Sequence, residues 1–356
     1  MCQIKRRSFL SSSAGLIGGG LIAAKAIHGE NVRHHPAALS VMTETANRFL
    51  AGLNAEQRSK AVFAFADDER MNWHFIPKER KGLPFREMMP YQKHLASALL
   101  ASGLSQAGYI KAITIMSLDD VLRVMENDSG ERRNPEKYYV SIFGTPSDSG
   151  TWGWRVEGHH LSQNYTVTNG QVVDGPSFFG SNPAEVLEGP RKGLRVLSAE
   201  DDMGFELIHA LDEPLRKTAI VDVKAYGDIL TAASRKAALA GQPSGLSAAK
   251  LNAKQFDVLR ALTELYAGNL PDELARRRMK QIDQAGRTAY FAWAGGTNPR
   301  DPHYYRIQTS AFLIEFDDTQ DKANHIHSVW RDLSSDFGGD LLQAHYETGH
   351  HHGHES

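Results

Sequence analysis

The sequence predicts an α+β fold built from two similar halves. Runs with apolar residues at helical spacing alternate with short runs rich in β-branched and aromatic residues. Two of the strand-like runs, residues 138–145 and 290–297, resemble one another at an offset of 152 residues. A predicted hairpin follows each run. Because amphipathic helices bury their apolar faces against a sheet, each half is expected to be a sheet covered by helices.

Three co-linear matches support the predicted internal duplication. Besides the first pair, residues 154–156 match 305–307, and residues 202–208 match 336–342. Each half then has the order helix, helix, strand, hairpin, loop, helix, and a pseudo-twofold axis is expected between them. Chance similarity between short β segments is the alternative. The predicted halves, 36–240 and 246–346, are joined by a linker rich in Gly, Pro and Ser.

Helical spacing, caps and chain breakers place the remaining elements. Asn54 is an expected helix N-cap, and residues 117–120 resemble a fresh helix start within a longer helical stretch. The Gly- and Pro-rich residues 175–183 predict a loop over a cleft, anchored by Phe178 and Phe179. The predicted helices cover residues 36–60, 91–102, 105–126, 200–211, 247–267 and 272–285.

A loop over residues 78–86 carries a cluster of basic side chains. An ordinary solvated loop explains it, and an anion-binding lip on a pocket is the alternative. Its basic residues are Lys78, Arg80, Lys81 and Arg86.

Composition excludes several classes of function. The pI near 6.8 and the formal charge of −2 give no electrostatic footprint for nucleic acid. The only cysteine is Cys2, so a disulfide framework and a thiolate ligand or nucleophile are excluded from the mature chain. The sequence contains no Walker or dinucleotide phosphate loop, no Gly-x-Ser-x-Gly elbow and no His-Glu-x-x-His helix.

The first residues predict an export signal. Arg6 and Arg7 precede a weakly apolar run over residues 11–24, and Ala24-Lys25-Ala26 resembles a cleavage site. Residues 1–26 are therefore expected to direct the chain to the twin-arginine export machinery, with cleavage leaving no stable membrane span. An uncleaved membrane anchor is the alternative. The expected location is periplasmic or extracellular.

The other end of the chain is rich in histidine. Residues 347–356 have no apolar anchor and are expected to form a disordered tail. Such a tail chelates metal ions weakly, and we assign it to no catalytic site.

Residues 154–166 are the most informative stretch. They predict a β-hairpin that turns at Gly158, with His159 and His160 on the return strand. A second predicted hairpin covers residues 305–316, and residues 325–327 follow it with the sequence His-Ile-His. We expect the two hairpins to lie side by side, with their histidines near one pocket.

The two-residue period of a strand decides which histidines can meet. His160 would share a face with Ser162 and Asn164, and His159 would share the more apolar face with Leu161 and Gln163. His160 is therefore the better candidate, and His159 joins it only if a bulge follows Gly158.

His325 and His327 are two residues apart, which places both imidazoles on one face of an extended segment. His159, His160, His325 and His327 are thus the candidate ligands of a divalent metal, zinc or another transition metal.

Charged neighbours supply candidate catalytic and substrate-binding groups. Glu157 or Asp332 could act as general base on metal-bound water. Asp332 could instead be a further metal ligand or fix the tautomer of a ligand histidine. The candidate groups for holding a substrate carboxylate or phosphate are Arg155, Arg306, Arg331 and Asn164. The arginines could equally form ion pairs on the strand surface.

Several of these runs together resemble the family known as domain of unknown function 3500. They are Glu-Gly-His-His at residues 157–160, His-x-His-x-x-Trp-Arg-Asp at 325–332, the run at 179–184, and Asp-Phe-Gly at 336–338. The likeness extends over residues 41–346 and implies no established reaction. A His-Gly-Pro-like turn is expected in related sequences where this chain has Gln-Thr-Ser at 308–310, so the second hairpin turn departs from the family pattern.

These features lead to three hypotheses of function. The first is an exported metal-dependent hydrolase acting on an unspecified small-molecule or polymer substrate. The second is a periplasmic or extracellular binding or metal-handling protein without catalysis. The third is a protein whose histidines are structural.

Overall fold

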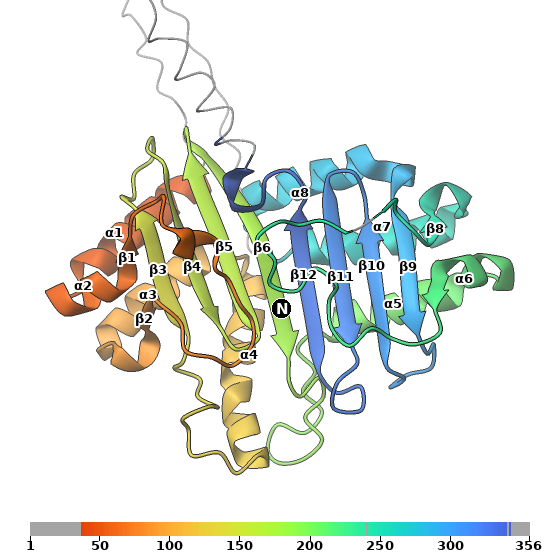
Figure 1. The fold of residues 1–356 in the computed structure, drawn as a ribbon, viewed down its shortest axis with the longest axis horizontal. Helices are drawn as coiled ribbons and strands as arrows, with labels where there is room; N and C mark the ends of the chain where they lie inside the picture. Colours follow the sequence, from red (N-terminus) through yellow and green to blue (C-terminus); the bar gives the residue numbers. More distant parts are fainter. Residues whose placement is uncertain (1–36, 240, 340–341, 343–356) are drawn as a thin grey trace, which may run out of the picture. The chain divides into compact units, whose positions relative to one another are not determined.

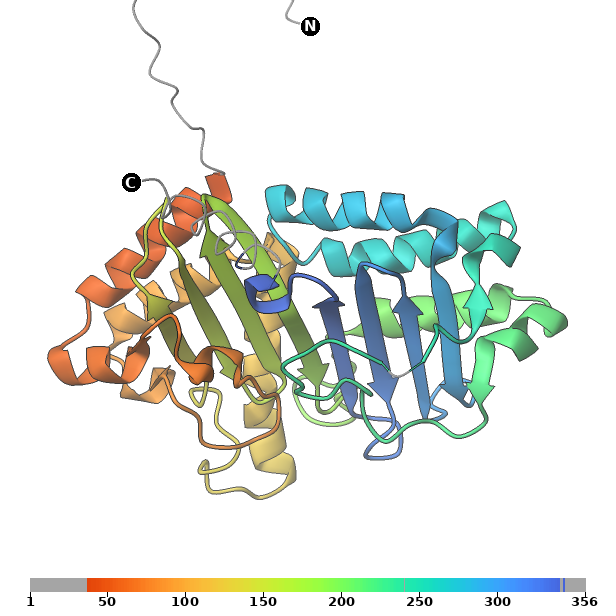
Figure 2. The ribbon, with the colours of Figure 1, turned by 45° about the horizontal axis from the view of Figure 1, so that its top comes forward.

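Helices cover one face of a single mixed sheet, and two irregular connections cover the other (Figures 1 and 2). The structure, a computed structural model, describes residues 37–239, 241–339 and 342, which all lie within one compact unit. This part of the chain contains eight α-helices and twelve strands, which confirms the predicted α+β class. The predicted signal and the histidine-rich tail lie outside the described residues.

The helices follow the predicted order with shifted bounds. They are α1 (Ala37–Ala51), α2 (Ala55–Ala61), α3 (Pro90–Ser102), α4 (Gln106–Met125), α5 (Ser198–Ala210), α6 (Glu213–Ala219), α7 (Ala253–Ala267) and α8 (Asp272–Ala285). Short 3₁₀ turns are η1 (Asp68–Met71), η2 (Phe85–Glu87), η3 (Ala248–Lys250), η4 (Gly286–Thr288) and η5 (Asp336–Gly338).

The strands divide into eight long ones and four short ones. The long strands are β3 (Tyr139–Gly144), β4 (Trp152–Gly158), β5 (Leu161–Thr168), β6 (Gln171–Ser181), β9 (Tyr290–Gly295), β10 (His303–Gln308), β11 (Phe312–Asp318) and β12 (Ile326–Asp332). The short strands are β1 (Val62–Phe63), β2 (Leu83–Pro84), β7 (Ile220–Asp222) and β8 (Leu246–Ser247).

The strand order brings distant parts of the chain together at the middle of the sheet. The order is β1-β3-β4-β5-β6-β12-β11-β10-β9-β7, with β2 on β3 and β8 on β9. All pairings are antiparallel except β1 with β3 and β7 with β9. Antiparallel β6 and β12 join the two sets of strands, and their register places Gly180 opposite His327.

Local signals explain most of the helix ends. The Asn54 side chain accepts the backbone hydrogen of Gln57, and the Gln57 side chain accepts the backbone hydrogen of Asn54. The predicted N-cap is therefore a full capping box. Asn252 and Gln255 repeat this device at the start of α7. The start predicted at residues 117–120 is wrong, because these residues lie inside α4. There Ser117 donates its hydroxyl hydrogen to the carbonyl of Thr114 within the helix.

The helical face of the sheet carries the main hydrophobic core. In α1 the buried residues Leu39, Met42, Ala46 and Phe49 recur at helical spacing and pack with α3. The sheet contributes alternate residues such as Trp154, Tyr165 and Trp330. Trp154 stacks on Tyr165 at a centroid distance of 4.2 Å.

The opposite face is covered by the connections over residues 64–82 and 223–245. A smaller cluster packs there, formed by Trp73, Phe75, Phe178, Ile229, Val329 and Phe337. Buried carboxylates on the sheet hold both connections. Glu157 accepts the backbone hydrogen of His74 at 2.9 Å, and Glu315 accepts those of Leu230 and Thr231 at 2.6 and 3.1 Å.

The loop predicted over residues 175–183 is wrong. Residues 171–181 form β6, a central strand, and Phe178 and Phe179 point to its two faces. A strand tolerates Pro176 here because the ladder to β5 shifts register between Gln163 and Tyr165. The Asn164 side chain donates to the Pro176 carbonyl oxygen at 2.9 Å across this irregularity. The duplication also predicts a final helix over residues 336–342, which match 202–208, but the described part of this segment is the short turn η5.

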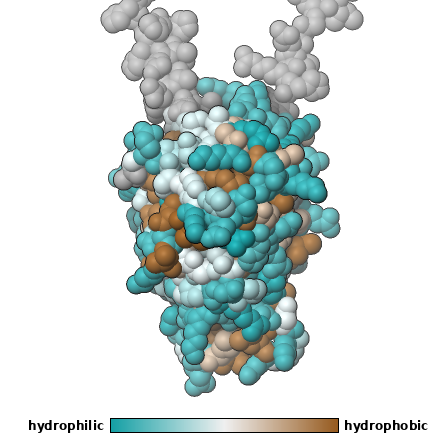
Figure 3. All heavy atoms as spheres, turned by 90° about the vertical axis from the view of Figure 1, so that its right-hand side faces the viewer, coloured by the Kyte–Doolittle hydropathy of each residue, from teal (hydrophilic) through white to brown (hydrophobic). Residues whose placement is uncertain are grey.

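The surface shows no continuous apolar band on the face seen in Figure 3, where small apolar patches are separated by polar residues. No helix in the described ranges has the length and apolar character needed to cross a membrane.

A buried ion pair connects α8 to the central strands and allows a test of the packing. Arg278 pairs with Asp174 of β6, donates to the Tyr266 carbonyl oxygen at 2.9 Å and lies 4.4 Å over the Trp330 ring. Arg278→Met should lower the free energy of unfolding by about 3–5 kcal/mol, because Asp174 stays buried without its cation. Adding Asp174→Asn should recover part of this loss in urea denaturation. Equal stability of the single and double variants would contradict this account.

Candidate metal centre

The tip of the β4–β5 hairpin forms one side of the site. His159 and His160 are the two-residue turn between Gly158 and Leu161, so their predicted place on the return strand is wrong. His160 adopts a φ of 61°, a left-handed conformation that residues other than glycine rarely enter. Its amide donates to the Phe75 carbonyl oxygen at 2.9 Å, and its carbonyl oxygen accepts from the Gly180 amide at 2.7 Å. The turn is thus held from both sides.

The start of β12 forms the other side. His160 Nε2 lies 2.8 Å from His325 Nε2 and 3.3 Å from His327 Nε2. One ligand atom from each ring lies within 4.8 Å of the others, and this buried group could hold a metal ion. Residues 325 and 327 share a face because they are two apart in an extended segment. The prediction that distant imidazoles meet here is confirmed for these three residues. The two predicted hairpins are not neighbours, however, because β6 and β12 lie between them in the sheet.

Carboxylates contact the outer nitrogens of two of these rings. His327 Nδ1 lies 2.9 Å from Asp228 and 3.6 Å from Asp317, and His325 Nδ1 lies 3.0 Å from Asp321. A carboxylate at Nδ1 favours a hydrogen on that nitrogen and leaves Nε2 with its lone pair. His325 therefore directs an acceptor nitrogen toward His160, and His327 does so once it has lost its second proton, as a metal ligand must.

The pKa values follow from burial and from these carboxylates. Burial lowers the pKa of His160 well below its usual value, and neighbouring imidazoles act in the same direction. Burial and the charge of His327 lower the pKa of His325 to about 4. Burial alone would lower the pKa of His327, but Asp228 and Asp317 outweigh it and raise the pKa to about 9. A cation bound at the centre would replace the proton of His327.

His159 lies outside this group of three. Its ring stacks on His160 at 3.8 Å. Its Nδ1 lies 2.8 Å from Asp119, and Arg133 approaches Nε2 at 3.1 Å. The His159 ring therefore packs against His160, and both of its nitrogens already contact other side chains.

The two predicted general bases contact other groups of the protein. Asp332 ends β12, where it accepts from Gln281 of α8 and from the amides of Ser334 and Ser335. It is five residues from His327, about 17 Å along the strand, and on the opposite face. Glu157 is buried against Arg155 at 3.0 Å and holds the His74 amide.

The predicted substrate-binding groups contact other parts of the protein. Arg155 pairs with Glu69, Arg331 pairs with Asp336, and Arg306 donates to Ser244. The Asn164 amide supports the β5–β6 irregularity described above. In the basic loop, Arg80 donates to the Gly158 carbonyl oxygen at 3.0 Å, while Lys78 and Lys81 are exposed.

Several residues of the site were missed by sequence reasoning. Asp228, Asp317 and Asp321 come from a connection, a strand and a loop with no distinctive motif around them. Asp321 lies four residues before His325, which is the one local signal that could have pointed to it. Gly180 was also missed, although a side chain there would lie 3.0 Å from the His160 ring and 2.9 Å from the Ile326 carbonyl oxygen.

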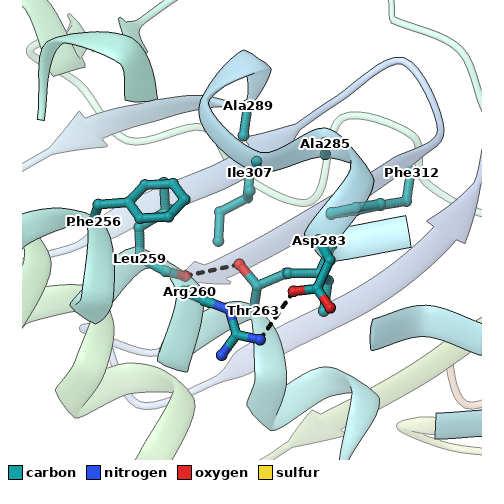
Figure 4. A pocket seen from close by; sticks show the side chains of 11 residues that line it. Phe256, Leu259, Arg260, Thr263, Asp283, Ala285, Ala289, Ile307 and Phe312 are labelled. Atoms are coloured by element: carbon teal, nitrogen blue, oxygen red, sulfur yellow. Dashed lines mark hydrogen bonds and ion pairs between the residues drawn. The ribbon is translucent and has the colours of Figure 1, made fainter. Parts of the chain in front are cut away.

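A different pocket lies between α7, α8 and β10 (Figure 4). It has a volume of about 100 Å³ and a largely apolar wall that includes Phe256, Ile307 and Phe312. The Arg260–Asp283 ion pair lies at its edge. Ligand pockets are typically about 300–1,000 Å³, so this is a packing gap rather than a second site.

The fold and the site define an α+β protein with a buried three-histidine cluster on one face of a mixed sheet. Residues 36–339 match the family described as "Protein of unknown function (DUF3500)", and the chain belongs to this family. No curated protein and no solved structure matches the chain significantly.

The close fit of His160 over Gly180 provides a test. Gly180→Ala should weaken zinc binding at least about tenfold, because the added methyl group would lie 3.0 Å from the His160 ring and 2.9 Å from the Ile326 carbonyl oxygen of β12 and must displace one of them. Zinc affinity is measured by competition with a chromophoric chelator. Gly268→Ala is the matched control, since its added carbon meets only ordinary contacts at 3.4 and 3.5 Å. Unchanged zinc affinity in Gly180→Ala would show that His160 is not held this way.

Proposed function

We propose that this protein binds a divalent transition metal through the Nε2 atoms of His160, His325 and His327. The observation that carries the proposal is the convergence of these three atoms, at 2.8 and 3.3 Å from His160. Nitrogens around a tetrahedral ion at about 2.1 Å would lie about 3.4 Å apart, so a small adjustment of the rings would fit the ion. Imidazole ligands suit zinc, copper, nickel and iron.

We further propose that the ion serves hydrolysis. Three neutral imidazoles leave the double charge of the ion uncompensated, and such an ion lowers the pKa of bound water to about 7. The residues of the chain orient the ligands: Asp228 and Asp317 hold His327, and Asp321 holds His325. Glu157 and Asp332 then have structural roles, because their carboxylates accept hydrogen bonds from the His74 amide and the Gln281 side chain.

A metal-handling protein without catalysis is the second candidate, and burial favours it. His160 and His327 are 4% and 3% exposed, and the His325 side chain is 12% exposed. A substrate would have to reach the ion from the His325 side. Storage or transfer of an ion needs no such approach.

The cellular setting remains part of the proposal. The twin-arginine pattern in residues 1–26 supports export to the periplasm or beyond by the twin-arginine machinery. The near-neutral charge supports a small-molecule or polymer substrate rather than nucleic acid.

We also propose that the fold arose by duplication. The strand order has the same pattern when followed inward from either edge, since β1, β3, β4, β5 and β6 correspond to β7, β9, β10, β11 and β12. Two helices precede β1 and β7, and two more precede β3 and β9. The repeat then covers residues 37–181 and 198–332, so we place its boundary after β6 instead of at the linker 241–245.

Metal analysis tests the first proposal. Protein lacking residues 347–356 should retain one equivalent of transition metal, and His160→Ala, His325→Ala or His327→Ala should weaken zinc binding at least about 100-fold. His94→Ala, at an exposed position of α3, should leave it unchanged. Equal metal content in all four variants would exclude the cluster as the site.

Turnover separates the two candidate functions. The metal-loaded protein should hydrolyse at least one member of a panel of esters, phosphoesters and glycosides, and chelation or His325→Ala should abolish that activity. The same panel with His94→Ala controls for contaminating enzymes. A stoichiometric metal without turnover on any member would instead favour the metal-handling candidate.

A further inference from the structure

A pocket of about 680 Å³ lies near the three-histidine cluster, between α5 and the loops around residues 184–195, 299–303 and 318–324. This volume suits a small organic molecule. The pocket shares part of its wall with the metal centre. Asp321 lines it and lies 3.0 Å from His325 Nδ1, and Asp318 lines it and accepts the His325 amide at 2.8 Å.

The floor of the pocket presents buried hydrogen-bond acceptors. His303 is 1% exposed, and its Nδ1 lies 2.9 Å from the Asp301 carbonyl oxygen, to which it donates. A ring that carries a single hydrogen, on Nδ1, offers Nε2 as an acceptor. His303 Nε2 and Asp201 Oδ1 lie 3.1 Å apart, yet neither atom makes a hydrogen bond within the part of the chain that is described. A ligand that donates hydrogens would satisfy both atoms.

The charges on the wall favour a positive ligand. Arg195 pairs with Asp201 and Asp202, and Arg300 pairs with Glu185. Glu206, Asp318 and Asp321 also line the pocket, and none of them has a lysine or arginine partner among residues 37–239, 241–339 and 342. Lys322 is the one remaining lysine or arginine lining this pocket, so the wall keeps an excess of negative charge.

The wall also offers an aromatic surface. Phe205 projects from α5 and packs at 4.5 Å from the His303 ring, which itself stacks on Trp293 at 5.0 Å. An apolar or aromatic group of the ligand could contact Phe205 while its charged end reaches the floor.

We propose that this pocket binds a small organic cation, with an ammonium or guanidinium group against Asp201, His303 and Asp318 and an apolar part against Phe205. This inference goes beyond the proposed metal chemistry and does not require it, because the contacts to the cation come from the pocket floor. A ligand bound here lies beside Asp321 and hence beside His325.

Three probes that share one ring test the charge preference. Benzylammonium should bind the full-length protein saturably and with 1:1 stoichiometry at pH 8, with a Kd of about 1 mM expected for a molecule of this size. Benzyl alcohol should bind at least about tenfold more weakly, and benzoate should not bind. Calorimetry or ligand-observed NMR gives the affinities.

Variants locate the binding site. Asp318→Asn and Glu206→Gln should each weaken benzylammonium binding at least about fivefold. Asn at position 318 keeps an acceptor for the His325 amide, and Glu206 is exposed on α5, so both variants are expected to fold. Asp257→Asn, in α7 outside the pocket, is the matched control and should leave the affinity for benzylammonium unchanged.

Removal of metal separates this proposal from the metal proposal. Chelator-treated protein should bind benzylammonium as tightly as untreated protein. Binding of benzoate as tight as that of benzylammonium, or unchanged affinity in both pocket variants, would overturn the proposal.

Discussion

The hydrogen bond from the Gly180 amide to the His160 carbonyl oxygen is the contact on which the candidate site depends. It holds the tip of the β4–β5 hairpin against Gly180 of β6. Gly180 is also the residue that pairs with His327 of the next strand, β12. Glycine is needed at this position because a side chain would meet the His160 ring. The pairing of β6 with β12 therefore positions the imidazoles as well as joining the two sets of strands.

Buried charge organises the same face of the sheet. Glu157 and Glu315 each accept backbone hydrogens from a covering connection, so the sheet holds its cover by hydrogen bonds to carboxylates. Asp228, which touches His327, belongs to the second of these connections. Burying such groups is costly unless they are bonded. The arrangement thus ties the position of the connection over residues 223–245 to the orientation of a candidate metal ligand.

The sequence was sufficient for the secondary structure class and for the meeting of His160 with His325 and His327. These predictions rest on local patterns in the sequence, namely the helical period of α1, α7 and α8 and the two-residue spacing of His325 and His327. The remaining features depend on tertiary contacts. Pro176 lies in a strand because a register shift and Asn164 accommodate it, and Asp332 faces α8 because strand alternation turns it away from His327. Asp228 is 99 positions away from His327, so no local pattern connects them.

The most direct test of the three-histidine site is anomalous diffraction from crystals of the zinc-loaded protein, without residues 347–356, at the zinc absorption edge. The account predicts one strong peak about 2.0–2.1 Å from Nε2 of His160, His325 and His327. A peak bound only by Asp228, Asp317 and Nδ1 of His327, or no peak near these rings, would contradict it.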